Sequence, residues 1–299
     1  MQGFRRIGVL ASLHHPQVLD TLKALLAFLE REGKEVLVEE SLAGDLGAAN
    51  VAYADRDHLG RAVELVIVVG GDGSMLAAAR DLVHYGVPLL GVNRGRLGFL
   101  TDIHPAEIET RLKEVLEGRY LVSERFLLAL QLLRAGRPLG GSLALNDVVL
   151  HPGKSVRMLE FELFIDEQFV YSQRSDGLIV STPTGSTAYA LSAGGPILHP
   201  SLSAMVLVPM NPHTLTSRPI AIPGDSSVEI RLGERRDLHP QVTCDGQVDF
   251  CVEPGDLIRI EREATTLKLI HPRDHNFYAI CRTKLGWASR LDSESHIER

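Results

Sequence analysis

The residues best placed to do chemistry are an acid among glycines, the sequence GGDG at positions 70–73. Five apolar residues, 65–69, precede it, and apolar residues at helical spacing follow it. This order predicts a buried strand, a tight turn and an amphipathic helix. The glycines let a ligand approach the backbone, and the N–H groups at the start of a helix suit a phosphate.

Asp72 is unexpected in a simple phosphate cradle, because its carboxylate would repel the phosphates. Its presence is explained if it holds a metal ion or takes a proton from an attacking hydroxyl. An ordinary strand-to-helix turn with a surface aspartate fits the same residues and stays open at this point.

Two familiar glycine-rich motifs are excluded. Walker A closes with Lys followed by Ser or Thr, whereas Gly73 is followed by Ser74 and Met75. The dinucleotide fingerprint needs Gly or Ala where Leu76 stands, and an acid at the end of the next strand, which instead ends at Asn93.

A second polar stretch, RSDGLIVSTPTGSTAYALSAGGPILHP, occupies residues 174–200. Its centre, 182–189, places hydroxyls and a glycine ahead of a short helical run, and so offers several donors and one aromatic ring to a ligand. We interpret the cluster as a site, although each hydroxyl alone fits a loop cap. Residues 145–147, LND, and 244–247, CDGQ, are by themselves typical of turns.

The composition narrows the class of protein. A chain of 299 residues is long enough for two domains, and its net charge of −7 argues against nucleic acid or an anionic membrane as the main partner. No apolar run approaches the ~20 residues of a membrane span, and the N-terminus lacks a signal-peptide core. Three cysteines without a C-x-x-C pair fit a reducing compartment and no zinc site. We expect a cytoplasmic protein.

The first part of the chain predicts an α/β domain. Strands at 6–12, 34–40, 65–69 and 87–93 alternate with helices that follow Pro16, Asp72 and Pro105, which indicates a Rossmann-like, mostly parallel sheet covered on both sides. Residues 41–57 show no regular pattern.

From Tyr120 onward the pattern is strand-like. Apolar and polar residues alternate in stretches such as 159–165, 228–232, 256–262 and 265–271, with turn residues such as 166–168 between them, which predicts an all-β sandwich. The expected domains are therefore 1–119 and 120–271. The tail, about 272–299, includes a helical stretch and is expected to pack back on the first domain.

Together the motifs resemble the NAD kinase family, in its bacterial ATP-using branch. GGDG, LND, SDG with TPTGSTAY (175–189), GGPILHP (194–200) and CDGQ occur in that family's order and approximate spacing over nearly the whole chain. GGDG is shared with diacylglycerol, sphingosine and 6-phosphofructokinases. Its combination with DG-x-x-x-STPTGSTAY is far more specific.

The resemblance implies transfer of the γ-phosphoryl group of ATP to the adenosine ribose 2′-hydroxyl of NAD, giving NADP, with Mg²⁺ as cofactor. It also implies an N-terminal α/β domain, a C-terminal β-sandwich and a site between them. The implied partners are NAD, ATP and further copies of the chain in a homodimer or homotetramer, with neither nucleic acid nor membrane.

The family roles fall on particular residues. Asp72 would be the general base, with Gly71 and Gly73 cradling phosphate. Asn146 and Asp147 match an Asn-Glu pair that binds the adenosine ribose hydroxyls, and Asp shortens the carboxylate's reach by one methylene. The other residues expected to bind the substrates are Arg157, Arg174, Asp176, Thr187, Ala188, Tyr189, Ser192 and Gln247.

Two other functions remain open. Another GGDG kinase, acting on a lipid or a sugar phosphate, would leave TPTGSTAY unexplained. A catalytically silent NAD-binding sensor would have no reason to keep Asp72 beside phosphates.

Overall fold

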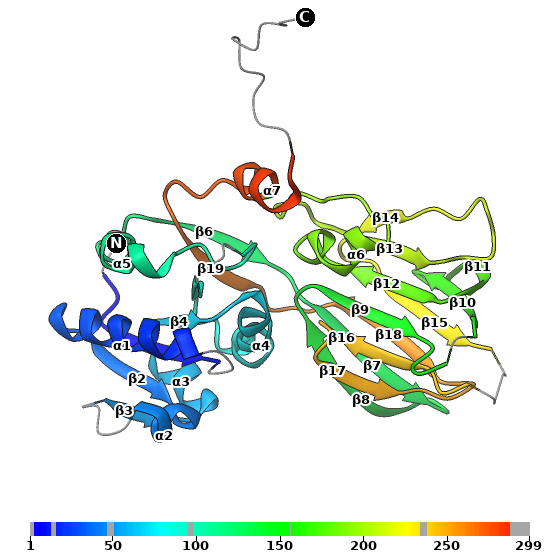
Figure 1. The fold of residues 1–299 in the computed structure, drawn as a ribbon. Helices are drawn as coiled ribbons and strands as arrows, with labels where there is room; N and C mark the ends of the chain where they lie inside the picture. The colour runs from blue at the N-terminus through cyan, green and yellow to red at the C-terminus, as the bar shows by residue number, and fades with distance from the viewer. Residues whose placement is uncertain are drawn as a thin grey trace, which may run out of the picture. The chain divides into compact units, whose positions relative to one another are not determined.

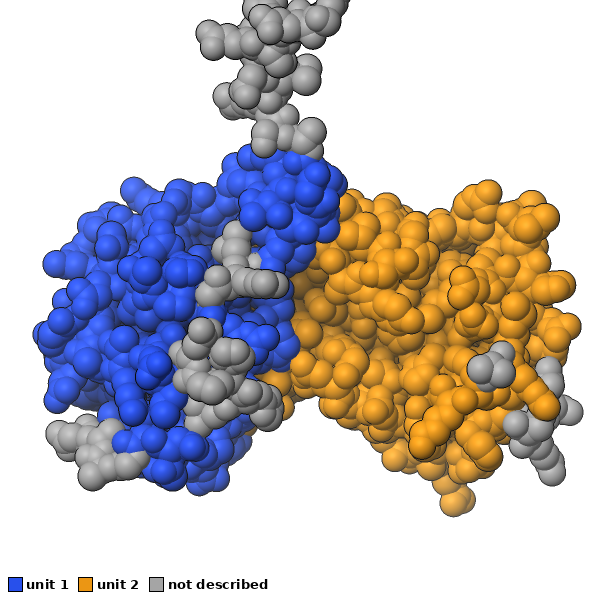
Figure 2. Space-filling view, viewed as in Figure 1, with its two compact units in different colours: residues 1–75, 88–122, 270–299 blue, residues 76–87, 123–269 orange. Residues whose placement is uncertain are grey.

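A computed structural model describes residues 3–12, 16–46, 51–94, 98–155, 157–233 and 238–287. The chain divides into two units, coloured in Figure 2: unit 1 comprises residues 1–75, 88–122 and 270–299, and unit 2 comprises residues 76–87 and 123–269. Among the helices described, none is both long enough and apolar enough to cross a membrane.

Unit 1 is built on a seven-stranded sheet with the strand order β3-β2-β1-β4-β5-β19-β6 (Figure 1). The pairs β1–β2, β1–β4, β2–β3 and β4–β5 are all parallel, which confirms the predicted α/β fold. The strands are β1 (Arg6–Ala11), β2 (Glu35–Glu39), β3 (Ala52–Ala54), β4 (Leu65–Val69), β5 (Leu89–Val92), β6 (Tyr120–Arg125) and β19 (Leu267–Pro272). The helices are α1 (Pro16–Arg31), α2 (Ala43–Leu46), α3 (Arg56–Ala62), α5 (Ile108–Leu116) and α7 (Phe277–Leu285). Helix α4 (Asp72–Leu82) begins in unit 1, and its residues from Leu76 onward belong to unit 2.

Strand β4 is the centre of this sheet because all five of its residues are buried. Leu65 and Ile67 join a core cluster with apolar residues of α1 and α5. Val66 and Val68 point to the opposite face and are equally buried, so helices cover both sides. This burial leaves the end of β4 as a fixed platform for the GGDG turn.

Residues 41–57 contain more structure than their sequence pattern indicates. The 3₁₀ turn Glu40–Leu42, helix α2, strand β3 and the start of α3 lie here, while residues 47–50 are outside the described part of the chain. Strand β3 has only three residues, which is too short for an alternating pattern to show. Asp55 begins α3 by accepting the His58 backbone N–H at 2.7 Å.

Two strands that alternate like those of a sandwich lie instead in the seven-stranded sheet. Strand β6 is at the edge of this sheet, and β19 is its neighbour. Alternation of apolar and polar residues indicates that the two faces of a strand have different environments. It does not indicate which sheet the strand joins. The helical stretch predicted in the tail is α7, whereas residues 288–299 lie outside the described residues.

Unit 2 consists of two six-stranded sheets, ordered β11-β10-β15-β18-β7-β8 and β14-β13-β12-β9-β16-β17, and every pairing described within them is antiparallel. The predicted β-sandwich is confirmed. The first sheet contains β7 (Leu128–Arg134), β8 (Arg137–Ala144), β10 (Leu159–Ile165), β11 (Gln168–Ser175), β15 (Val228–Leu232) and β18 (Leu257–Arg262). The second contains β9 (Asp147–His151), β12 (Gly177–Ser181), β13 (Ala204–Met210), β14 (Ile220–Pro223), β16 (Gln241–Cys244) and β17 (Val248–Cys251).

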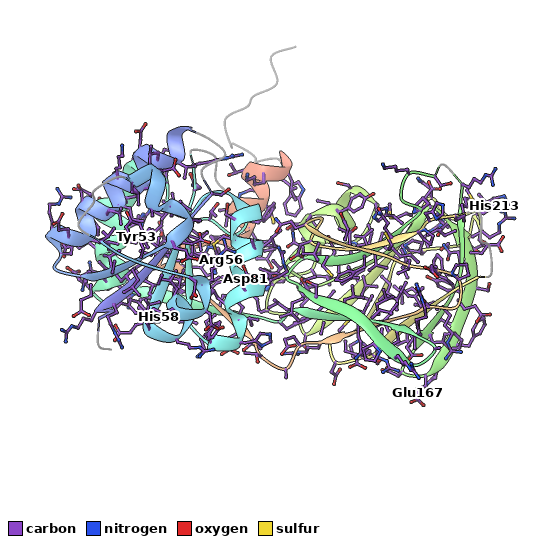
Figure 3. All side chains as sticks on the ribbon, turned by 90° about the horizontal axis from the view of Figure 1, so that it is seen from below. Tyr53, Arg56, His58, Asp81, Glu167 and His213 are labelled. Atoms are coloured by element: carbon purple, nitrogen blue, oxygen red, sulfur yellow. The ribbon has the colours of Figure 1, made fainter. Side chains whose placement is uncertain are left out.

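The two sheets share one core, in which Phe161 of β10 packs with Leu178 of β12 and their neighbours. The predicted turn at 166–168 joins β10 to β11, and Figure 3 labels Glu167 within it. Asp166 and Glu167 both have positive φ angles, as a tight hairpin turn requires.

The outer face of the second sheet carries a smaller cluster. Val149 of β9 and Ile179 of β12 pack there against Ala190 of helix α6 (Tyr189–Ser192) and against Leu198. This apolar contact fixes the polar segment 182–200 on the sheet, and so determines where its side chains are presented.

Candidate functional site

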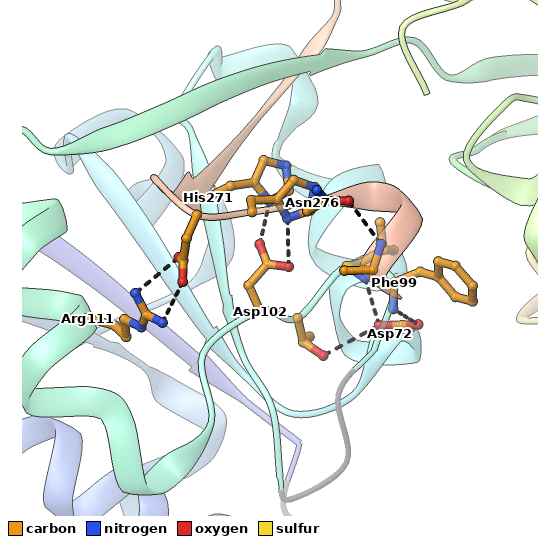
Figure 4. A network of polar contacts seen from close by, with 11 residues as sticks. Asp72, Phe99, Asp102, Arg111, His271 and Asn276 are labelled. Atoms are coloured by element: carbon orange, nitrogen blue, oxygen red, sulfur yellow. Dashed lines mark hydrogen bonds and ion pairs between the residues drawn. The ribbon is translucent and has the colours of Figure 1, made fainter. Parts of the chain in front are cut away.

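The Asp72 carboxylate is held by the backbone of a distant segment of unit 1 (Figure 4). Its Oδ2 accepts the Phe99 N–H at 2.9 Å and its Oδ1 accepts the Leu100 N–H at 3.1 Å. The Thr101 hydroxyl lies 3.5 Å from the same Oδ1. Oδ2 has a further lone pair beyond its contact with Phe99, so the half-buried side chain keeps the ability to accept a proton or bind a cation.

Gly98 makes this arrangement possible because no side chain fits at its position. A Cβ added there would lie 2.0 Å from Asp72 Oδ1 and 2.5 Å from the Thr101 hydroxyl oxygen. The sequence pattern predicts no role for residues 98–101. Gly98 is the only local indication in the sequence that this turn makes a close contact, and it does not identify Asp72 as the residue contacted.

A pocket of about 680 Å³ lies within unit 2. This volume suits a small organic ligand. Five of the residues predicted to bind substrate line it: Asn146, Asp147, Asp176, Ala188 and Tyr189. The other lining residues are not among those predicted to bind substrate; they are Val149, His151, Pro152, Gly153, Ser155, Met210, Thr243, Asp245 and Gly246.

Asp245 organises one wall of this pocket. It lies in the β16–β17 turn with a positive φ of 53°, and its side chain is buried. The carboxylate accepts N–H groups from Leu145 at 3.1 Å, Asn146 at 2.7 Å and Asp147 at 3.3 Å. It also pairs with Arg80 of α4 at 2.8 Å. CDGQ is therefore a hairpin turn, as expected, but its acid also fixes the LND segment.

The pocket carries a second buried acid, Asp147, which is 4% exposed. Burial, together with the nearby charge of Asp245, raises the pKa of Asp147 to about 7. Burial also raises the pKa of Asp245, although the hydrogen bonds from Asn146, Leu145 and Arg80 oppose this. The two acids together disfavour a second negative charge in the pocket, and a ligand that offers hydroxyl donors would relieve that cost.

A histidine completes the same wall. His151 Nδ1 accepts the Gly153 N–H at 3.2 Å, which assigns the ring proton to Nε2, and Nε2 lies 2.9 Å from the Thr243 hydroxyl. That hydroxyl donates to Asp249 at 2.6 Å. Burial lowers the pKa of His151 against the opposing charge of Asp249, so the ring is a neutral, fixed part of the pocket.

Most hydroxyls of the segment 182–187 support the fold. Thr182 donates to the Leu145 carbonyl at 2.5 Å, Ser186 donates to the Pro183 carbonyl at 2.7 Å, and Thr187 donates to the Thr184 carbonyl at 3.2 Å. The Thr182 bond ties the segment to Leu145, next to Asn146, and the other two bonds stabilise the turn of the segment itself. The cluster reaches the pocket through Ala188 and Tyr189, and the hydroxyls act as the loop caps that each suggested alone.

The remaining predicted residues lie outside the lining of this pocket. Arg174 pairs with Glu160 at 3.0 Å, and Gln247 accepts a hydrogen bond from Arg80 at 2.5 Å. Arg157 and Ser192 are exposed. Gly71 and Gly73 flank Asp72 at the start of α4 in unit 1.

The whole chain is similar to known proteins. The family model for the ATP-NAD kinase N-terminal domain matches residues 7–120, and that for the ATP-NAD kinase C-terminal domain matches residues 145–272. The NAD kinase of Azotobacter vinelandii is 57% identical over 295 residues, which cover 99% of this chain and 100% of the relative. The NAD kinase of Pseudomonas fluorescens SBW25 is 55% identical over 291 residues, covering 97% and 98%.

Solved structures agree with this fold. An NAD kinase from Archaeoglobus fulgidus in complex with ATP superposes with a TM-score of 0.72 at 26% identity, covering 94% of this chain and 97% of that chain. Yeast NADH kinase complexed with NADH gives a TM-score of 0.87 at 24% identity, covering 97% and 90%, which supports the fold alone.

The raised pKa of Asp147 predicts a pH-dependent stability. The native ligand-free protein keeps a proton that the unfolded chain loses near pH 4, so the free energy of unfolding falls as pH rises from about 4 to 7. Asp147→Asn removes this effect and should be more stable than wild type at pH 8 by up to ~4 kcal/mol, with a smaller difference at pH 5. Urea unfolding at both pH values measures it.

The exposed Asp225, in the same unit, provides the matched control, since Asp225→Asn changes a carboxylate that stays in solvent. A stability difference for Asp147→Asn that is the same at pH 5 and pH 8 would contradict this account of the pocket.

Proposed function

This chain belongs to the NAD kinase family, and we propose that it transfers the γ-phosphoryl group of ATP to the adenosine ribose 2′-hydroxyl of NAD, giving NADP and ADP. One observation carries the proposal: a carboxylate, Asp72, is fixed at the start of a helix inside a glycine turn that suits phosphate. An acid at that place serves no purpose in phosphate binding alone, and it is what a proton acceptor for an attacking hydroxyl requires.

In the proposed reaction Asp72 accepts the proton of the 2′-hydroxyl as that oxygen attacks the γ-phosphorus. A new O–P bond forms, and the bond between the γ-phosphorus and the oxygen bridging to the β-phosphate breaks, so that ADP leaves with the electron pair. Phosphoryl transfer needs little covalent help from the protein and depends on in-line positioning and on neutralised phosphate charge. The turn at Gly71 and Gly73 and the positive end of α4 supply part of that neutralisation.

We assign the 680 Å³ pocket of unit 2 to the dinucleotide. Asn146 and Asp147 offer an amide and a carboxylate to ribose hydroxyls, and Tyr189 offers an exposed aromatic ring to a flat base. The hydroxyls of a ribose would donate to the buried acids of this pocket. This assignment rests on the lining residues and on the family motifs.

The site also fits Mg²⁺. This ion prefers oxygen ligands and binds proteins through one or two carboxylates while keeping phosphate and water oxygens. Asp72 has a carboxylate lone pair, on Oδ2, beyond those used by its donors, and so is the residue that would hold or approach the ion. Bound with ATP, the ion supplies charge neutralisation at the transferred phosphoryl group.

We further propose that the protein is a cytoplasmic homodimer or homotetramer. Strand β11 is at the edge of its sheet and exposes Phe169, whose residue surface is 59% accessible, so its backbone and this ring are available for pairing between copies. The three cysteines, which are unbridged, support a reducing compartment.

Replacing the proposed base tests the reaction. Asp72→Asn should lower kcat for NADP formation by about 10²- to 10⁴-fold, because proton transfer to the carboxylate is lost, and should leave the calorimetric Kd for NAD nearly unchanged. Asp81→Asn, which changes an exposed acid on the same helix (Figure 3), should retain wild-type turnover. Full turnover in Asp72→Asn would refute the assignment.

The segment that holds the Asp72 carboxylate gives a second test of the proposed reaction. In Gly98→Ala the new methyl group would lie 2.0 Å from Asp72 Oδ1 and must displace the carboxylate. A displacement on the order of 1 Å should reduce kcat about 10²-fold. Gly44→Ala adds a methyl group with no atom within 4 Å and should leave kcat unchanged. Equal kcat for both variants would show that the position of Asp72 does not matter.

A further inference from the structure

A second cluster of titratable side chains lies directly after the segment that holds Asp72. Asp102 and His271, at the end of β19, lie side by side (Figure 4), and a second histidine, His275 before α7, also contacts Asp102. His271 Nδ1 contacts one carboxylate oxygen of Asp102, and His275 Nδ1 lies 3.1 Å from the other. All three residues belong to unit 1.

The cluster is enclosed. The side chains of His271, Asp102 and His275 are 2%, 9% and 14% exposed, and the two imidazole rings stack with centroids 3.9 Å apart. One ligand atom from each residue lies within 4.8 Å of the other two. Three potential ligands therefore converge in a space that solvent barely reaches.

The contacts show which protons an ion would displace. His271 and His275 both meet Asp102 through Nδ1, so a proton shared in each contact must leave when that nitrogen binds a metal ion.

An ion has a route to the cluster. A pocket of about 220 Å³ is lined by Asp102 and His275, with Glu107 beside them. Arg111 also lines it, but its guanidinium is paired with Asp274 through two contacts of 3.0 and 2.6 Å, so its positive charge is compensated. The pocket leaves room for water at a position that the protein does not fill.

We propose that Asp102, His271 and His275 form a binding site for a divalent transition-metal ion of the Zn²⁺ type, with an open position toward this pocket. Two imidazole nitrogens and one carboxylate are a donor set that Zn²⁺ and Co²⁺ bind with three protein ligands and a water molecule. Mg²⁺ prefers oxygen ligands alone, so this site is separate from the Mg²⁺ expected with ATP. The lack of a C-x-x-C pair predicts no zinc site built on cysteines, whereas the ligands here are histidines and an aspartate.

Co²⁺ is the probe for the test because it absorbs visible light when four-coordinate, whereas Zn²⁺ is silent. Chelator-treated full-length protein, free of nucleotide, should take up one equivalent of Co²⁺ with the visible bands of a four-coordinate ion. Zn²⁺ should displace it and should raise the Tm of the wild type, since a ligand that binds only the native state stabilises it.

Variants separate the proposed ligands from other histidines. His275→Ala and Asp102→Asn should weaken Co²⁺ binding by more than the roughly 10–100-fold that loss of an outer hydrogen-bond partner costs, and should abolish the Tm shift with Zn²⁺. His58→Ala, which changes an exposed histidine of α3 (Figure 3), should bind like wild type.

Circular dichroism verifies that His275→Ala is folded, and Asp102→Asn gives an independent result from a change of one atom. The absence of a four-coordinate Co²⁺ spectrum in the wild type would overturn the proposal. So would equal Co²⁺ affinity in the wild type and in both ligand variants.

Discussion

The position of the Asp72 carboxylate is the constraint on which the proposed chemistry depends. A negative side chain at the proposed phosphate-binding turn is electrostatically unfavourable, and it stays there because the Phe99 and Leu100 N–H groups hold both of its oxygens. Those donors can approach only because Gly98 has no side chain. Strand β4, buried on both faces, and the start of α4 then fix the other end of the same residue.

In unit 2, buried polar groups hold the segment 145–147 in place. Asp245 satisfies the three consecutive N–H groups of residues 145–147, and Thr182 satisfies a carbonyl of the same segment. The segment that presents Asn146 and Asp147 is therefore rigid before any ligand binds. This arrangement places two buried acids, Asp147 and Asp245, in the pocket. Burial and the charge of Asp245 raise the pKa of Asp147 to about 7, which favours a ligand rich in hydroxyl donors.

Local patterns in the sequence predicted the elements that carry the site, because burial of β4 and the helical spacing after Asp72 are local properties. The family resemblance added Asn146, Asp147, Asp176, Ala188 and Tyr189, which the structure brings together in one pocket. Neither the local pattern nor the resemblance predicted that Asp245 holds the backbone of residues 145–147. Its turn pattern is genuine, and its second role arises only because β16 pairs with β9.

Contacts between residues far apart in the sequence also explain the other features that the sequence did not predict. Gly98 and its neighbours contact Asp72 across 26 to 28 positions, and Asp102 meets two histidines about 170 positions away. The local sequence pattern of either segment does not indicate which distant residues it contacts. Thr182 and Ser186 show a further limit, because hydroxyls that stabilise a loop and hydroxyls that bind a ligand have the same sequence pattern.

The most direct test of the proposed reaction compares ADP released from ATP and Mg²⁺ with and without NAD, while an NADP-specific dehydrogenase measures the second product. We expect ADP release to depend on NAD and to be matched mole for mole by NADP. Firm NAD binding without NADP would contradict the account and favour a silent sensor. The absence of both NAD binding and NADP would direct attention to lipid and sugar phosphate acceptors.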